Sequence, residues 1–194
     1  MTFDLDTYWS TEHDEHLTVA EKAFQTLKPD FERMLDVCAT AVSNGGKILF
    51  FGNGGSAADA QHLATELTIR YISDRKPIPA IALTTDTSAL TAAGNDYGFD
   101  HIFSRQLEAL GNAGDIAIGI STSGNSQNVL NALKSATNKN MTTIGLTGNN
   151  GGKMNDLCDI TLTAPSTTTA RIQEIHILIG HLLCGALEQK LGLV

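Results

Sequence analysis

Short apolar runs alternate with longer segments of helical periodicity along this chain. Five of the runs are rich in isoleucine and leucine and are flanked by glycine, asparagine and threonine, which is typical of strands. They cover residues 47–51, 80–83, 116–120, 143–146 and 160–163. Helical patterns cover residues 57–70, 102–110, 128–137 and 170–191. The alternation predicts a three-layer αβα sandwich around a five-stranded parallel sheet, with right-handed crossovers and a ligand site at the carboxyl ends of the strands.

Residues 4–43 have helical spacing, and Pro29 interrupts the pattern, so we expect two helices there. The glycines after Asn44 end this region. We divide the chain into an N-terminal helical arm, residues 1–44, and an α/β domain, residues 45–194, without a linker between them. The chain is therefore expected to form one structural unit. The arm either mediates association or packs on its own sheet.

Charge and composition narrow the classes of function. The net charge is −8 and the isoelectric point about 5.1, which argues against binding to nucleic acid or to an anionic membrane. An anionic substrate therefore needs a local pocket of hydrogen-bond donors. We find neither an apolar run of about eighteen residues nor a signal-peptide pattern. The three cysteines form no CxxC pair, so we expect reduced thiols in a cytoplasmic protein.

Two loops at strand ends are candidates for an anion site. Gly52-Asn53-Gly54-Gly55-Ser56 follows the first strand, and Ser121-Thr122-Ser123-Gly124-Asn125-Ser126 follows the third. Glycine allows close approach of the backbone, hydroxyls donate, and each following helix points its positive end at the ligand. The alternative is a pair of ordinary helix caps. Neither loop fits a nucleotide P-loop or the dinucleotide fingerprint, and the similar loop 147–153 is interpreted as a turn.

Ionisable side chains follow the first of these loops. His62 and Glu66 are four residues apart and project from one face of the predicted helix, with Asp59 one turn earlier. The alternative is a solvated helix face, although Leu63 and Leu67 favour a partly enclosed pair. Asn95-Asp96 follows a short helical segment and either binds sugar hydroxyls or caps a turn.

The last helix carries Gln173 and His181. A histidine on its apolar face is commonly a core residue. The two side chains are eight residues apart, about 12 Å along a straight helix. One metal ion holds both only if the helix bends or if they come from different subunits. If both are used, the spacing favours a site at a subunit interface.

Four motifs resemble those of sugar isomerase (SIS) domains and, more closely, those of the bacterial phosphoheptose isomerases. In chain order they are Gly52-Asn53-Gly54-Gly55-Ser56, Gly94-Asn95-Asp96-Tyr97-Gly98-Phe99, Gly119-Ile120-Ser121-Thr122-Ser123-Gly124-Asn125-Ser126 and Arg171-Ile172-Gln173-Glu174-Ile175-His176. The resemblance implies a flavodoxin-like SIS fold and a homotetramer with active sites at subunit interfaces. It also implies conversion of D-sedoheptulose 7-phosphate to D-glycero-D-manno-heptose 7-phosphate, which supplies heptose for lipopolysaccharide or related glycans.

The resemblance also implies roles for particular residues. Substrate contacts fall on Asn53, Gly54, Gly55, Glu66, Asn95, Asp96, Ser121, Thr122, Ser123, Ser126 and Gln173, and we add Ser56 from its place in the first loop. Zinc ligands fall on His62, Glu66, Gln173 and His181. One position departs from the pattern: Ala170 stands where some members have an aspartate, so a substrate contact by that carboxylate is not expected here.

An aldose–ketose isomerase moves a proton between C1 and C2 of an open-chain sugar through an enediol. We assign Glu66 as the base over C1 and His181 as the acid near the carbonyl oxygen, with zinc polarising the carbonyl. Because a metal-bound carboxylate is a poorer base, Asp59 is the reserve candidate. Two alternatives are a SIS protein that binds the replication initiator without catalysis and a SIS enzyme for another phosphosugar. Some proteins of the first kind have lost the residues that match Glu66 and His181, and this chain has both.

Overall fold

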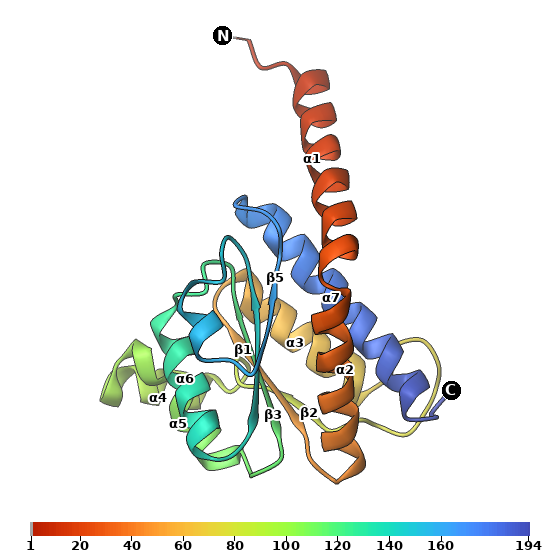
Figure 1. Ribbon diagram of the computed structural model, residues 1–194. Helices are drawn as coiled ribbons and strands as arrows, with labels where there is room; N and C mark the ends of the chain where they lie inside the picture. Colours follow the sequence, from red (N-terminus) through yellow and green to blue (C-terminus); the bar gives the residue numbers. More distant parts are fainter. Residues whose placement is uncertain (1) are drawn as a thin grey trace.

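The structure, a computed structural model, describes residues 2–194. Its centre is a five-stranded sheet, all parallel, in the order β2-β1-β3-β4-β5 (Figure 1). The strands are β1 (Ile48–Gly52), β2 (Ala80–Ala82), β3 (Ile116–Ser121), β4 (Thr142–Thr147) and β5 (Ile160–Thr163). All five predicted strands are thus confirmed to within a residue or two at each end. The strand order is that of flavodoxin-like folds, whose chain reversal lies between the first and third strands.

Helices connect and cover the strands. They are α1 (Leu5–Thr26), α2 (Lys28–Ser43), α3 (Gly55–Thr68), α4 (Thr87–Tyr97), α5 (Ser104–Leu110), α6 (Gln127–Asn138) and α7 (Thr169–Lys190), with short 3-10 turns η1 (Phe99–His101) and η2 (Gly152–Asp156). Side chains alternate along each strand, so that Ile48 and Phe50 enter one core cluster and Leu49 and Phe51 the other. The predicted three-layer sandwich is confirmed.

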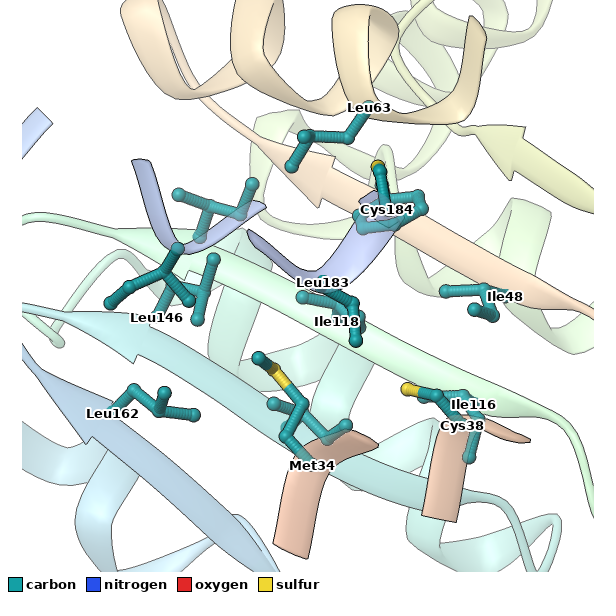
Figure 2. Close-up of a cluster of buried hydrophobic side chains, with 14 of the residues drawn as sticks. Met34, Cys38, Ile48, Leu63, Ile116, Ile118, Leu146, Leu162, Leu183 and Cys184 are labelled. Carbon is teal, nitrogen blue, oxygen red and sulfur yellow. The ribbon is translucent and has the colours of Figure 1, made fainter. Parts of the chain in front are cut away.

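The two faces of the sheet have different helices. The larger core cluster joins α2, α3 and α7 to the sheet, and Figure 2 shows Met34 and Cys38 of α2 together with Leu63 of α3 and Leu183 of α7. The second cluster includes Ala93 of α4, residues of α5 and α6 and Met154 of η2. The face that carries α3 and α7 also brings together the ionisable residues of these two helices.

The two N-terminal helices meet at Leu27, two residues before the predicted break. Pro29 lies inside the first turn of α2, where the missing N–H has no helical partner to lose. α2 packs on the sheet, whereas α1 projects away from the body of the molecule (Figure 1). Packing on its own sheet is therefore confirmed for α2, and association through the arm stays a prediction.

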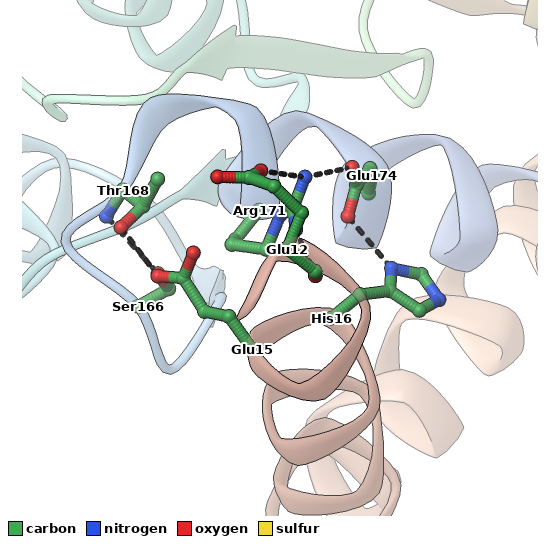
Figure 3. Close-up of polar contacts among 7 residues, drawn as sticks. All are labelled: Glu12, Glu15, His16, Ser166, Thr168, Arg171 and Glu174. Carbon is green, nitrogen blue, oxygen red and sulfur yellow. Dashed lines mark hydrogen bonds and ion pairs between the residues drawn. The ribbon is translucent and has the colours of Figure 1, made fainter. Parts of the chain in front are cut away.

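Polar contacts tie the middle of α1 to the start of α7 (Figure 3). Thr168 donates its hydroxyl to Glu15 at 2.6 Å, and His16 Nδ1 lies 2.7 Å from a carboxylate oxygen of Glu174. Arg171, which is 7% exposed, pairs with Glu174 at 2.7 Å.

None of the helices in residues 2–194 combines the length and apolarity that crossing a membrane requires.

Candidate active site

The two glycine- and serine-rich loops lie side by side. β1 and β3 are neighbours in the sheet, and Gly52 is in register with Ile120. Both strands point their carboxyl ends the same way, so residues 53–56 and 121–126 leave the sheet at one edge. The expectation that the two loops meet at a common edge is therefore confirmed.

The second loop gathers three hydroxyls. Ser121 Oγ lies 2.9 Å from Ser126 Oγ and 3.4 Å from Ser123 Oγ. Ser126 is the N-cap of α6, yet its side chain makes no capping hydrogen bond. Its hydroxyl faces Ser121 instead, so the positive end of α6 and the hydroxyls converge on one point. This arrangement suits a dianionic phosphate.

The loop after β4, residues 147–153, contacts and supports the second loop, residues 121–126, which we call the serine loop. Gly124 has φ +65°, and a Cβ there would overlap the backbone of Gly151. Met154 donates its N–H to the Gly124 carbonyl at 3.1 Å, and the Asn149 amide donates to Thr122 O at 3.3 Å. Loop 147–153, interpreted from sequence as a turn, is thus part of the support of the candidate phosphate site.

Asn53 is held by a residue that the sequence did not single out. Its amide and that of Asn128 exchange two hydrogen bonds of 2.8 Å, and Asn128 is 2% exposed. Asn128 Oδ1 also accepts the N–H of Val129 at 2.9 Å. The reciprocal pair joins the first loop to the first turn of α6. The position of Asn128, two residues after Ser126, was the signal available in the sequence.

The turn at Gly54 and Gly55 approaches α7 closely. Gly54 has φ +57° and ψ −121°, a conformation that L-residues rarely adopt. A Cβ at Gly55 would overlap the amide of Gln173, so the side chain of Gln173 lies directly against this loop. Ser56 is 4% exposed and packs beneath Gly52.

His62, Glu66 and His181 form an ionisable cluster within one chain. His62 Nε2 lies 2.8 Å from His181 Nε2 and 3.4 Å from Glu66 Oε1. The Glu66 side chain is 20% exposed and that of His62 is 48% exposed, so the cluster opens to solvent on one side. The ring of Tyr71 stacks on His181 with a centroid distance of 5.6 Å.

The prediction from spacing still holds for Gln173 and His181 together. His181 reaches the α3 pair within its own chain, whereas Gln173 does not, so a site that uses both still requires a bent helix or a second subunit. Gln173 lies at the other end of α7's contact with α3, against Gly55. His181 reaches His62 because α7 approaches α3 closely. A Cβ at Gly180 would overlap Leu63, so only glycine at this position allows α7 to come so near. No pattern in the sequence distinguishes Gly180 from the other glycines.

Asp59 lies one turn before His62 on α3. Its Oδ2 atom is buried without a hydrogen-bond partner. Burial raises the pKa of this carboxyl, and the neighbouring His62 partly offsets the rise. Asp59 therefore combines a raised pKa with a partly buried position.

Metal binding can be assessed from the donor atoms. Within residues 2–194, no group of three or more His, Cys, Asp and Glu side chains is already arranged as a metal centre. The donor chemistry at His62, Glu66 and His181 nevertheless suits zinc, which binds imidazole nitrogen and carboxylate oxygen. Two imidazole Nε2 atoms that face each other at 2.8 Å can share one proton or point both lone pairs at a cation.

Asn95 and Asp96 are not brought to this cluster. They lie in the last turn of α4, which begins after its cap Asp86 and ends before Gly98, rather than after a short helix. The Asn95 amide donates to the carboxylate of Asp96 at 2.7 Å. α4 belongs to the face of the sheet opposite α7 (Figure 1). A single chain therefore leaves this pair apart from Glu66 and His181.

Comparisons with known proteins agree on one family. Residues 13–148 match the family model described as the SIS domain. A phosphoheptose isomerase of Aliarcobacter butzleri is 56% identical over 177 residues, which cover 91% of this chain and 94% of that protein. A structure of phosphoheptose isomerase from Neisseria gonorrhoeae is 46% identical with a TM-score of 0.91, and one from Francisella tularensis is 39% identical with a TM-score of 0.93. The alignments cover 96% and 97% of this chain, respectively, and 100% of each solved chain.

Proposed function

Because this chain belongs to the SIS domain family and, within it, to the phosphoheptose isomerases, we propose that it converts D-sedoheptulose 7-phosphate to D-glycero-D-manno-heptose 7-phosphate. It is an aldose–ketose isomerase. The observation that carries the chemistry is the His62–Glu66–His181 cluster, whose helix α3 begins in the first of the two loops at this edge of the sheet. We further propose that the product enters heptose synthesis for lipopolysaccharide or related glycans.

The phosphate of the substrate is held by the serine loop. Ser121, Ser123 and Ser126 supply hydroxyls, and the first turn of α6 supplies backbone N–H groups and the positive end of its dipole. Lysine and arginine are not needed there, since neutral donors at a helix N-terminus are sufficient for anion binding. The phosphate fixes one end of the sugar, so C1 and C2 of the open chain extend toward α3 and α7.

Glu66 and His181 carry the proton transfers. Glu66 removes a proton from C1 of the ketose while His181 donates a proton to the carbonyl oxygen at C2, and an enediol forms. Glu66 then returns its proton to C2 while His181 takes back a proton from the C1 hydroxyl, which leaves the aldose and restores both side chains. His62 contacts both side chains, so Glu66 and His181 belong to one site, as this mechanism requires.

Zinc is proposed at His62, Glu66 and His181, and Gln173, which lies against Gly55 in the same chain, would join them as a further ligand from a second subunit. When bound, the ion would polarise the carbonyl and stabilise negative charge on oxygen. A carboxylate engaged with zinc is a weaker base, and in that case the raised pKa of Asp59 makes it the alternative base. Dialysis against a chelator followed by zinc titration, measured by calorimetry, tests binding separately from turnover.

A homotetramer with active sites at subunit interfaces is proposed as the working assembly. α1 exposes a row of large apolar side chains, among them Trp9 at 73% and Phe24 at 58%. A cavity of about 280 Å³ lies between the end of α1 and α7, and Phe24, Phe31 and Leu182 contribute to its apolar lining. Exposed apolar surface of this kind is typical of association, and a partner subunit could bring its Asn95–Asp96 pair to the site.

We also propose a cytoplasmic location. The structure supports it in that Cys38, Cys158 and Cys184 are all free. Burial raises the pKa of the Cys158 and Cys184 thiols to about 12, so both stay protonated and unreactive. Free buried thiols are usual in a reducing compartment.

The test is incubation with sedoheptulose 7-phosphate, with and without zinc and a chelator, followed by detection of the aldose product. Glu66→Gln and His181→Gln are each expected to lower kcat by about 100-fold or more. Asp59→Asn distinguishes the two candidate bases, and Glu32→Gln, on the exposed side of α2, is the matched control. Absence of turnover with zinc supplied would instead favour another phosphosugar substrate or a binding role without catalysis.

A further inference from the structure

Arg75 stands out as a buried charge that the reaction does not use. It lies in the segment between α3 and β2, and its side chain is 0% exposed. Its Nε donates to Glu188 of α7 at 2.7 Å. Its two remaining nitrogens donate at 2.8 Å to the backbone carbonyls of Leu67 and Glu66, at the end of α3. One guanidinium therefore joins α7 to the last turn of α3.

Glu188 extends this link to the imidazole of His181. The same carboxylate oxygen that accepts from Arg75 accepts the backbone N–H of Tyr71 at 3.2 Å. Tyr71 in turn stacks on His181, with an angle of 25° between the ring planes. Gly185 leaves room for that ring, because a Cβ there would lie 3.2 Å from Tyr71 Cε1. His181, Gly185 and Glu188 are spaced to lie along one face of α7.

Fold stability alone is a weak explanation for such a pair. A buried ion pair contributes little more than apolar residues of the same volume would, because both charges must leave water. Here Arg75 donates to the backbone carbonyl of Glu66 and to Glu188. Glu188 in turn orients Tyr71 against His181. Cys184 is also buried on α7, and burial, with added repulsion from Glu66 and Glu188, raises the pKa of its thiol to about 12. The thiol is therefore neutral, and Arg75 is the cation at this junction.

We propose that Arg75 is a positioning residue for the isomerase site: through Glu188 and Tyr71 it fixes the mutual geometry of Glu66 and His181. This inference rests on the proposed function. Arg75 does not touch the substrate. It holds the carboxyl end of α3 and the ring plane of His181 in the relation that proton transfer requires, and displacements of about 1 Å at such a site lower rates by about 100-fold.

The first test compares rates. Arg75→Lys keeps the charge but cannot donate to Glu188 and two carbonyls together, so kcat is expected to fall at least about 10-fold with KM nearly unchanged. Tyr71→Leu removes the stack and is expected to lower kcat similarly, whereas Tyr71→Phe keeps the ring and restores the wild-type rate. Arg33→Lys, on the exposed surface of α2, is the matched control.

The second test follows His181 by NMR, with histidine labelled at Cε1 and the signal assigned by its loss in His181→Gln. Ring current from Tyr71 shifts this signal in the wild type. The shift is expected to disappear in Tyr71→Leu, to persist in Tyr71→Phe and to change in Arg75→Lys. This measurement does not need turnover, so it remains informative if sedoheptulose 7-phosphate proves not to be the substrate.

The outcomes separate the two hypotheses. If Arg75→Lys and Tyr71→Leu lower only the melting temperature, with kcat and the His181 signal as in the wild type, the positioning role is overturned. A loss of kcat without any change in the His181 signal overturns it as well. If the Arg75 variant does not fold, Tyr71→Leu and its phenylalanine counterpart decide, since the Tyr71 side chain is only partly buried.

Discussion

Replacing His176 by glutamine is expected to remove a large part of the acid sensitivity of the folded protein. His176 lies on α7, is 0% exposed and places Nε2 2.9 Å from the carbonyl of Thr147 at the end of β4. Its Nδ1 atom is buried without a partner. Burial lowers the pKa of this imidazole from 6.5 to about 4, because a charged ring would lose its hydration there. The neutral ring donates to Thr147 and anchors α7 to the sheet.

The sign of the effect follows from linkage. Between pH 6.5 and about 4 the unfolded chain binds a proton at His176 and the folded chain does not. Stability is therefore intact above pH 6.5 and declines as the pH falls through this window. The full loss below the folded pKa is about 3 kcal/mol, and the part reached between pH 7.5 and 5.5 is about 1.3 kcal/mol.

The assay is urea unfolding at about pH 7.5, 6.5 and 5.5, a range in which ordinary carboxylates stay ionised. Protein concentration must be held fixed, because association adds to apparent stability. His176→Gln keeps an N–H for Thr147 but does not titrate, so its loss of stability between the extremes is expected to be smaller by about 1.3 kcal/mol than that of the wild type. His13→Gln, on the exposed part of α1, is the control and should behave as the wild type does. Equal pH dependence in wild type and His176→Gln would refute the reasoning.

Three further predictions concern substrate binding. Gly55→Ala places a methyl group against the Gln173 amide, so KM for the sugar phosphate is expected to rise about 10-fold, with the melting temperature within a few degrees of the wild type. Steady-state kinetics and a thermal scan measure both, and an unchanged KM would contradict the prediction. Asn128→Ala leaves the Asn53 amide unpaired, so urea unfolding should show that the free energy of unfolding falls by about 1–3 kcal/mol, and KM should rise. An unaffected KM would mean that the position of Asn53 does not depend on this pair. Ser126→Ala removes a hydroxyl that does not cap its helix, so stability should change by less than about 0.5 kcal/mol while competitive inhibition by inorganic phosphate weakens; the reverse pattern would assign Ser126 to capping.

Much of the fold was predictable because patterns over a few neighbouring residues determine it. The five strands and the parallel sheet follow from short apolar runs, and the meeting of the two loops follows from parallel strands ending at one edge. Errors of detail have local causes as well. Pro29 belongs to the first turn of α2, where proline is tolerated, so the helices separate earlier than the proline suggests. Asn95–Asp96 closes a helix whose weakly patterned sequence predicted only a short segment.

The candidate site was predictable only in its parts. The pairing of His62 with Glu66 is a matter of helical spacing and was available from sequence. The contact of His181 with His62 was not, because it depends on how closely α7 approaches α3, and that distance is set by Gly180 against Leu63. A straight-helix measurement correctly separates Gln173 from His181 but says nothing about which of them meets α3 and where.

Local sequence is sufficient to place particular residue types at the strand ends and on the helix faces, since hydrophobic periodicity, capping and turn chemistry act over a few residues. Which of these residues touch depends on the packing of the whole fold. The Asn53–Asn128 pair spans 75 residues of chain, and the Arg75–Glu188 pair spans 113. Contacts at such separations depend on the crossing and phase of helices packed on a shared sheet, and no local pattern encodes these.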